Sequence, residues 1–259
     1  MQALRSLAFN ILFFGWTALL LLATCPFAAF MSGHRMRRLA AFWMRVTHAL
    51  LRHVVGLDHE IVGRERLPEG PVLFASKHQS SWETMIFHVI RPDTVIGLKD
   101  ELRRIPIFGW YLLLGGNIRI DRAGAAQALR SLVTGAKEAA AQGCSILIFP
   151  EGTRRAPGAA PAYKPGVAAL YRALDLPCVP VALNSGLFWG RRSFIKKPGR
   201  ITLELLEPIP PGLDRRGFMQ ELELRIETAS DRLLAEARDR AAASGSDLHP
   251  VADGAPPQP

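Results

Sequence analysis

The longest hydrophobic stretch lies near the N-terminus, where residues 8–31 carry no charged side chain. At the rise of an α-helix this stretch is long enough to cross the hydrocarbon layer of a bilayer, so it predicts a membrane-associated helix. A cleaved signal peptide is the competing interpretation, because Arg5 precedes the stretch and Ala28 and Ala29 are small residues near its end. The apolar run is long for a signal peptide, which favours the membrane helix.

Residues 34–53 predict a second, amphipathic helix. Five arginines and no acidic residue are interspersed there with apolar side chains such as Leu39, Phe42 and Trp43. A basic amphipathic helix binds well to an anionic leaflet, and arginines after an apolar run place the following domain on the cytoplasmic side. We therefore expect the inner (cytoplasmic) membrane, with the rest of the chain facing the cytoplasm. Whether the N-terminal segment spans the bilayer or forms a re-entrant helix pair stays open, and an ordinary core-packing helix is the alternative for 34–53.

From residue 57 onward, short apolar runs alternate with helical patterns, which is typical of an α/β domain. Strands are expected at 71–76, 94–98, 145–149, 178–183 and 200–206. Helices are expected at 82–90, 124–142, 166–174 and 215–239. The chain thus divides into a membrane-anchoring helical segment at 1–56 and one domain at 57–240. Residues 241–259 are too small and polar to bury a core, so we expect a disordered tail.

The composition is both basic and apolar. The 32 Lys and Arg exceed the 23 Asp and Glu, giving a net charge of +9, and 49% of the residues are hydrophobic. This combination favours membrane lipids over nucleic acid as a partner, because the basic residues form no polar stripe interleaved with exposed aromatics. The three cysteines are odd in number and lie among apolar residues. They predict buried, reduced thiols and neither a disulfide framework nor a metal site.

Two residues that can carry proton chemistry follow directly on the predicted strand at 71–76. His78 and Glu83 are five positions apart. On a continuous helix they would point about 140° away from each other, so they meet only if His78 lies in a loop and Glu83 in the first helical turn. In that geometry Glu83 holds one imidazole N–H, and the other ring nitrogen can take a proton from a hydroxyl group.

A structural interpretation of the same residues competes with the catalytic one. Ser80 and Glu83 also form the pattern of a capping box, in which the carboxylate serves only the start of the helix. His78 is then a satisfied surface histidine. These residues alone leave both interpretations open.

Further blocks occur downstream in a fixed order. They are Gly116–Arg122 (GNIRIDR), Ile148–Arg154 (IFPEGTR), Tyr163–Gly166 (YKPG) and Val179–Val181 (VPV). With His78 and Glu83, they resemble the motifs of the glycerolipid acyltransferase family, most closely the bacterial 1-acyl-sn-glycerol-3-phosphate acyltransferases. The chain departs from the family pattern at Glu83, where the family has Asp, and at Arg119, where it usually has an apolar residue.

The resemblance implies a single α/β acyltransferase domain with a central mixed sheet flanked by helices, preceded by the membrane-associated helical segment. It implies transfer of an acyl chain from acyl-CoA or acyl carrier protein to the sn-2 hydroxyl of lysophosphatidic acid, without a metal or a cofactor. His78 would be the general base and Glu83 its partner. The residues that it implies for acceptor binding are Arg122, Glu151, Gly152, Thr153, Arg154 and Lys164.

Chemistry narrows the roles within this set. Guanidinium groups suit a phosphate best, so Arg122 and Arg154, with Lys164, are expected on the phosphate. Glu151 would repel a phosphate, and we expect it at the glycerol region or beside an arginine. Two other functions stay open: acylation of another lysolipid such as lyso-ornithine lipid, and a non-catalytic lipid-binding protein on the membrane.

Overall fold

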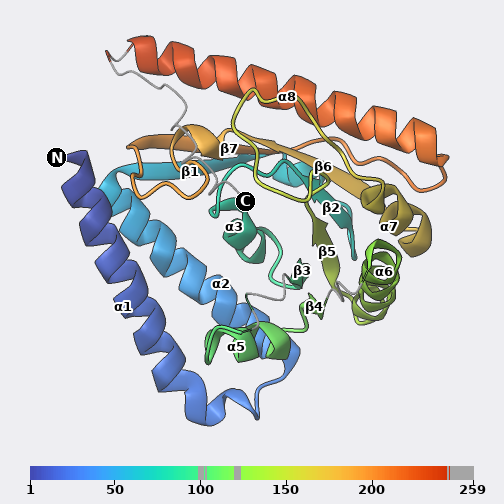
Figure 1. Ribbon diagram of the computed structural model, residues 1–259, viewed down its shortest axis with the longest axis horizontal. Coiled ribbons are helices and arrows are strands. Elements are labelled where there is room, and N and C mark those ends of the chain that lie inside the picture. The colour runs from blue at the N-terminus through green and yellow to red at the C-terminus, as the bar shows by residue number, and fades with distance from the viewer. Residues whose placement is uncertain (99–101, 103, 120–123, 244, 246–259) are drawn as a thin grey trace.

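The computed structural model describes residues 1–98, 102, 104–119, 124–243 and 245. At its centre is one seven-stranded sheet in the order β1-β7-β6-β2-β5-β3-β4 (Figure 1). All neighbouring strands are parallel except β6 and β7, so the sheet is mixed, as predicted. The strands are β1 (Leu57–Val62), β2 (Leu73–Ser76), β3 (Thr94–Leu98), β4 (Ile118–Arg119), β5 (Ser145–Ile148), β6 (Cys178–Leu183) and β7 (Gly199–Leu205).

Helices cover both faces of the sheet, which explains why the central strands are apolar throughout. Every residue of β2 and β6 is buried. One face packs against α6 (Ala125–Ala141), α7 (Gly166–Leu174) and α8 (Arg215–Ala243). The other packs against α3 (Glu83–Ile90) and a π-helical turn, η1 (Leu51–Val55), with α1 (Gln2–Ala28) and α2 (Gly33–Leu50) beyond them. Three short elements complete the order: η2 (Arg64–Arg66), α5 (Phe108–Leu114) and η3 (Ser185–Leu187).

The five predicted strands and the predicted helices are all present, within a few residues of their expected ends. The sequence analysis missed β1 because Asp58, His59 and Glu60 interrupt its apolar pattern. Polar residues are tolerated there because β1 is a half-exposed strand at the edge of the sheet. It missed β4 because two residues form no pattern. Helix α8 continues to Ala243, so residues 241–243, which were expected in the tail, are helical. Of residues 244–259 the structure describes only Gly245.

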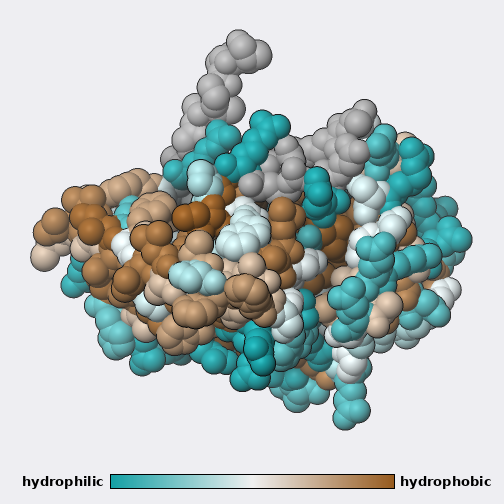
Figure 2. Space-filling model, turned by 90° about the horizontal axis from the view of Figure 1, so that it is seen from below, coloured by the Kyte–Doolittle hydropathy of each residue, from teal (hydrophilic) through white to brown (hydrophobic). Residues whose placement is uncertain are grey.

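Helix α1 is long and apolar enough to cross a membrane, with a mean hydropathy of 2.0 in its most apolar window. Some of its polar side chains contact the rest of the protein: the Lys196 backbone N–H donates to Ser6, and the Thr24 hydroxyl lies 2.7 Å from the Tyr111 hydroxyl. Large apolar side chains cover the outer side, among them Leu4, Ile11, Phe14, Leu19, Leu22 and Phe27. Figure 2 shows these hydrophobic atoms gathered on the side of the molecule where α1 lies.

The cysteines carry no disulfide. Cys144 and Cys178 are buried, as predicted, whereas Cys25 on α1 is only partly buried. Burial raises the pKa of the Cys178 thiol above its ordinary range, so the buried thiol stays protonated.

Candidate active site

The candidate site lies where β2, β5 and β6 end. These three strands are adjacent and parallel, so their carboxyl ends meet at one edge of the sheet. This edge is where α/β proteins commonly bind ligands. The loop after β2 carries His78, the loop after β5 carries residues 150–155, and β6 leads into η3.

His78 and Glu83 are in contact. The imidazole Nδ1 lies 3.0 Å from Glu83 Oε1; the histidine is 6% exposed and the glutamate fully buried. His78 lies in the loop and Glu83 is the first residue of α3, which is the arrangement that the spacing required. With Nδ1–H donated to the carboxylate, Nε2 keeps its lone pair and can accept a proton.

The Glu83 carboxylate also performs the capping role, so the two interpretations of the sequence are not exclusive. Oε1 accepts the backbone N–H groups of Gln79 at 2.7 Å and Ser80 at 2.5 Å in addition to the imidazole. Oε2 accepts the hydroxyl of Ser185, 2.8 Å away in η3. Because these donors converge on one buried carboxylate, its position is fixed by the imidazole, by the loop backbone and by η3, which follows 102 positions later.

Neighbouring contacts hold the imidazole and the loops around it. The ring of Phe149 stacks on His78 with centroids 3.9 Å apart. The backbone N–H of Arg155 donates to the carbonyl of His78 at 2.8 Å, which joins the loop after β2 to the loop after β5. Gln79 accepts the Gly186 N–H at 3.0 Å and so joins the same loop to η3. The ring of the general-base candidate therefore has one orientation.

The third motif block lies beside this histidine. Gly152 has a positive φ of 67°, and a side chain there would meet the Lys164 side chain at 3.2 Å, so glycine allows the close approach. Lys164 itself is exposed and Thr153 half-buried. Glu151 is almost fully buried and pairs with Lys77 at 3.1 Å. The expectation of an arginine partner is met only loosely, by Arg155 at 3.9 Å.

A concentration of positive charge borders the His78–Glu83 pair. Burial lowers the pKa of Arg154, the Glu83 carboxylate raises it, and the nearby Arg191 guanidinium lowers it further. Arg154 Nε is buried and has no hydrogen-bond partner among the residues that the structure describes. Two guanidinium groups held near each other favour an anion between them. Arg122, the other predicted phosphate ligand, lies outside the described residues.

The sequence analysis missed several residues of this neighbourhood: Lys77, Ser185, Arg191 and Glu227. Lys77 stands directly before the predicted histidine, but its burial is a property of the folded chain that a motif search does not detect. Ser185 and Arg191 follow the weak fourth block, and Glu227 belongs to α8. Only the folded chain brings these segments to the end of β2.

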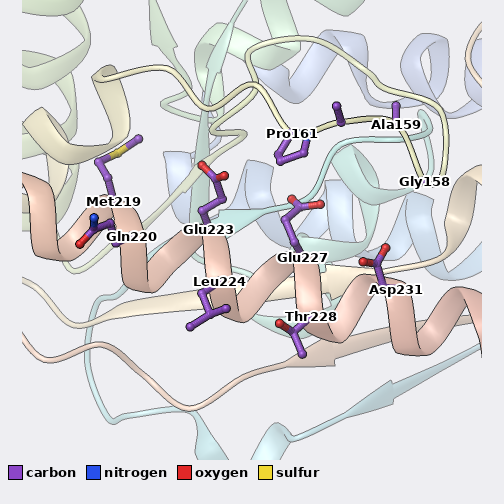
Figure 3. Close-up of a pocket in the computed structure, with 11 residues that line it drawn as sticks. Gly158, Ala159, Pro161, Met219, Gln220, Glu223, Leu224, Glu227, Thr228 and Asp231 are labelled. Carbon is purple, nitrogen blue, oxygen red and sulfur yellow. The ribbon is translucent and has the colours of Figure 1, made fainter.

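A pocket of about 680 Å³ lies between the loop 158–161 and α8 (Figure 3). Three carboxylates of α8 line it, those of Glu223, Glu227 and Asp231. An anionic phosphate would be repelled there. The pocket therefore does not suit the acceptor phosphate, although Glu227 also contacts Lys77 beside the site.

Comparisons with known proteins identify the family of the chain. Residues 58–184 match the family model described as Acyltransferase. A 1-acyl-sn-glycerol-3-phosphate acyltransferase of Pseudomonas aeruginosa is 34% identical over 245 residues, which cover 91% of this chain and 92% of the relative. This chain belongs to the acyltransferase family. A similarly named protein of Chlamydomonas reinhardtii is 30% identical over 78% of this chain and 63% of its own length.

The fold of this acyltransferase is also found in a solved structure. The crystal structure of the 1-acyl-sn-glycerophosphate acyltransferase from Thermotoga maritima superposes with a TM-score of 0.75 at 20% identity. The match covers 90% of this chain and 98% of that one. The predicted family and fold class are confirmed.

Proposed function

We propose that this acyltransferase moves a fatty acyl chain from acyl-CoA or acyl carrier protein to the sn-2 hydroxyl of 1-acylglycerol-3-phosphate, giving phosphatidic acid for phospholipid synthesis. The observation that carries the proposal is the buried contact between His78 and Glu83, 3.0 Å long, together with the nearby Arg154, whose Nε has no hydrogen-bond partner in the described part of the chain. A general base and an anion-binding group thus stand side by side. The names of the relatives support lysophosphatidic acid as the acceptor.

The reaction follows from the orientation of the imidazole. Nε2 of His78 takes the proton of the acceptor hydroxyl as its oxygen attacks the thioester carbonyl carbon. Glu83 stabilises the imidazolium that forms. The tetrahedral intermediate then collapses, its carbon–sulfur bond breaks, and the leaving thiolate receives the proton from the imidazolium. The new ester and the free thiol balance the reaction, and the thioester supplies the activation.

The acceptor phosphate is proposed to bind the guanidinium of Arg154 together with Arg122 and Lys164. Gly152 and Thr153 belong to the loop that presents Arg154, and the bare backbone of Gly152 leaves room for Lys164. Glu151 is turned away from this surface into its contact with Lys77, which removes its repulsion from the phosphate. Its part in acceptor binding is accordingly to hold the loop.

The lipid acceptor is proposed to enter from the cytoplasmic leaflet of the inner membrane. Apolar side chains on the outer side of α1 supply the surface that contacts lipid, and α2 adds arginines at the expected depth of the anionic headgroups. Since Ser6 and Thr24 of α1 bond to the domain, helix and domain form one unit that keeps the site close to the bilayer.

The decisive experiment supplies purified protein with labelled lysophosphatidic acid and either acyl-CoA or acyl carrier protein. Labelled phosphatidic acid with one of the donors is the expected product and also identifies the donor. Acylation of lyso-ornithine lipid in place of lysophosphatidic acid would move the proposal to another lysolipid. A folded protein that acylates neither lipid would be a non-catalytic binding protein.

Two variants test the assigned roles. His78→Ala is expected to reduce kcat by roughly 10³-fold or more while the protein stays folded, because the general base is lost.

Arg154→Ala is expected to raise the KM for lysophosphatidic acid about tenfold or more and to change the KM for the donor little. A folded His78→Ala protein with full turnover, or equal changes in both KM values for Arg154→Ala, would contradict these roles.

A further inference from the structure

A lysine is buried between two carboxylates next to the catalytic loop. The side chain of Lys77 is 2% exposed, and its Nζ lies 3.1 Å from Glu151 Oε1 and 2.8 Å from both oxygens of Glu227. Glu151 comes from the loop after β5 and Glu227 from α8, so one ammonium group joins three distant segments of the chain. Nothing in the reaction as derived above requires this lysine.

Glu227 is held in turn by a tyrosine. The hydroxyl of Tyr163 donates to Glu227 Oε1 at 2.8 Å, and burial together with the carboxylate raises the pKa of Tyr163. The side chain of Glu227 is 20% exposed, and it lines the acidic pocket (Figure 3). Glu223 and Asp231 line the same pocket one turn before and one turn after it, but neither is bonded to Lys77.

Because Lys77 and Glu151 are buried, the loss of one charged group of the Lys77, Glu151 and Glu227 cluster disturbs the others. Burial raises the pKa of Glu151, whereas Lys77 lowers it and Glu227 raises it. Glu151 Oε2 has no hydrogen-bond partner among the described residues, so the Lys77 ammonium is the principal group that compensates this carboxylate. A buried charge without its partner is costly. The position of Lys77 therefore decides where Glu151 sits.

The placement of Glu151 extends to the residues that bind the substrate. Glu151 lies inside the turn that is closed by the bond from the Gly152 N–H to the Phe149 carbonyl, 2.9 Å long, and Arg154 follows this turn. Backbone hydrogen bonds flank Glu151 in the loop after β5. The Lys164 N–H donates to the carbonyl of Pro150, and the Arg155 N–H donates to the carbonyl of His78, both at 2.8 Å. A shift of Glu151 therefore moves Arg154 relative to His78.

We propose that Glu227 is a positioning residue for the acceptor site. Through Lys77 it fixes Glu151, and the turn that contains Glu151 then presents Arg154 to the acceptor phosphate. Tyr163 orients Glu227 for this contact. Helix α8 thus contributes to the recognition of the lysolipid although none of its side chains reaches the substrate. This inference rests on the proposed function of the site.

The test compares Glu227→Gln with Glu223→Gln, which removes the same charge from the same face of α8 without touching Lys77. Glutamine is isosteric and leaves Lys77 and Glu151 as a balanced pair, so the variant is expected to fold. For Glu227→Gln we expect the KM for lysophosphatidic acid to rise about tenfold, with kcat and the donor KM within about twofold of wild type. Glu223→Gln is expected to match wild type in all three constants.

A double variant distinguishes a network from general destabilisation. Tyr163→Phe alone is expected to raise the acceptor KM by a smaller factor, and in the Glu227→Gln background to add nothing, because both act through Lys77. If the increases in the acceptor KM caused by the two single substitutions multiply in the double variant, the proposal is overturned. An unchanged acceptor KM in Glu227→Gln, or the same rise in Glu223→Gln, would also overturn it. If His78→Ala abolishes turnover in the same assay, such results refute only the role of Glu227 and leave the proposed function standing.

Discussion

At the scale of single residues, Glu83 shows how a glutamate can occupy the place of the family's aspartate. The side chain is one methylene longer than aspartate, and its second oxygen reaches the hydroxyl of Ser185 in η3. The first oxygen stays with His78 and the backbone of the loop. The additional length is therefore taken up by a bond to Ser185, and the contact to the imidazole is kept.

Replacing Glu83 by Gln or Asp separates its two duties. Glutamine can keep its carbonyl oxygen on the Gln79 and Ser80 N–H groups and turn its amide toward Ser185, so the fold should persist. It loses the charge that stabilises the imidazolium, and kcat is expected to fall on the order of 10²- to 10⁴-fold. Aspartate keeps the charge but is too short to reach both Ser185 and His78, so we expect intermediate activity.

Steady-state turnover and thermal unfolding of the two variants are the measurements. Near wild-type turnover of a folded Glu83→Gln protein would reduce the residue to a helix cap. A lower activity for Asp than for Gln would show that reach matters more than charge.

At the scale of elements, α1 combines an inner side bonded to the domain with an outer side of exposed apolar residues. Deleting it would also remove Phe9 from the core, so loss of membrane binding would be confounded with unfolding. Substitutions on the outer side avoid this problem. Ile11, Leu19 and Leu22 are each more than 60% exposed and contribute little to the fold.

The triple variant Ile11→Asn, Leu19→Asn, Leu22→Asn is therefore expected to leave the membrane fraction. Each apolar side chain contributes roughly 1.5–3 kcal/mol when it is buried in lipid, and the loss of three weakens binding by several powers of ten. Sedimentation with liposomes gives the measurement, and circular dichroism confirms the fold. A folded triple variant that still sediments would place the lipid-binding surface elsewhere.

The end of α2 carries a histidine that links stability to pH. His48 packs 4.5 Å from the ring of His59, and its Nε2 has no partner in the described part of the chain. The pKa of His48 is lowered to about 3, chiefly by burial and also by the neighbouring His59, while Asp58 opposes the shift. The unfolded chain binds a proton below pH 6.5, but folded His48 does not until near pH 3. The stability from this residue is present above pH 6.5 and is lost as the pH falls toward 3.

The variant His48→Phe removes this linkage and keeps an aromatic ring beside Trp82. One such group contributes at most about 1.4 kcal/mol to the free energy of unfolding per pH unit. Between pH 6.5 and 5, wild type should lose roughly 1–2 kcal/mol more than the variant in urea unfolding. His59 and His88, whose pKa values are also lowered by burial, retain their own contributions in both proteins. If wild type and His48→Phe lose the same free energy of unfolding between pH 6.5 and 5, the linkage to His48 is contradicted.

At the scale of the whole molecule, the parts that the sequence predicted are those whose information is local. The buried strands have uninterrupted apolar runs, and the contact between His78 and Glu83 follows from five positions at a strand-to-helix junction. The environment of Glu151 could not be predicted in this way. Its partner Lys77 lies 74 positions before it. Glu227, the second partner of Lys77, lies on α8, 150 positions after the lysine, and only the tertiary fold brings the three residues together.

Strand β1 cannot find its partner until most of the chain has been synthesised. Glu60 of β1 pairs with Thr202 of β7, 142 positions later. Translation proceeds from the N-terminus, so α1 and β1 leave the ribosome while β7 does not yet exist. The apolar helix α1 is thus available to a bilayer before the sheet can close. Such a non-local pairing forms slowly, and early attachment of the nascent chain to the membrane would keep its apolar helix from aggregating in the meantime.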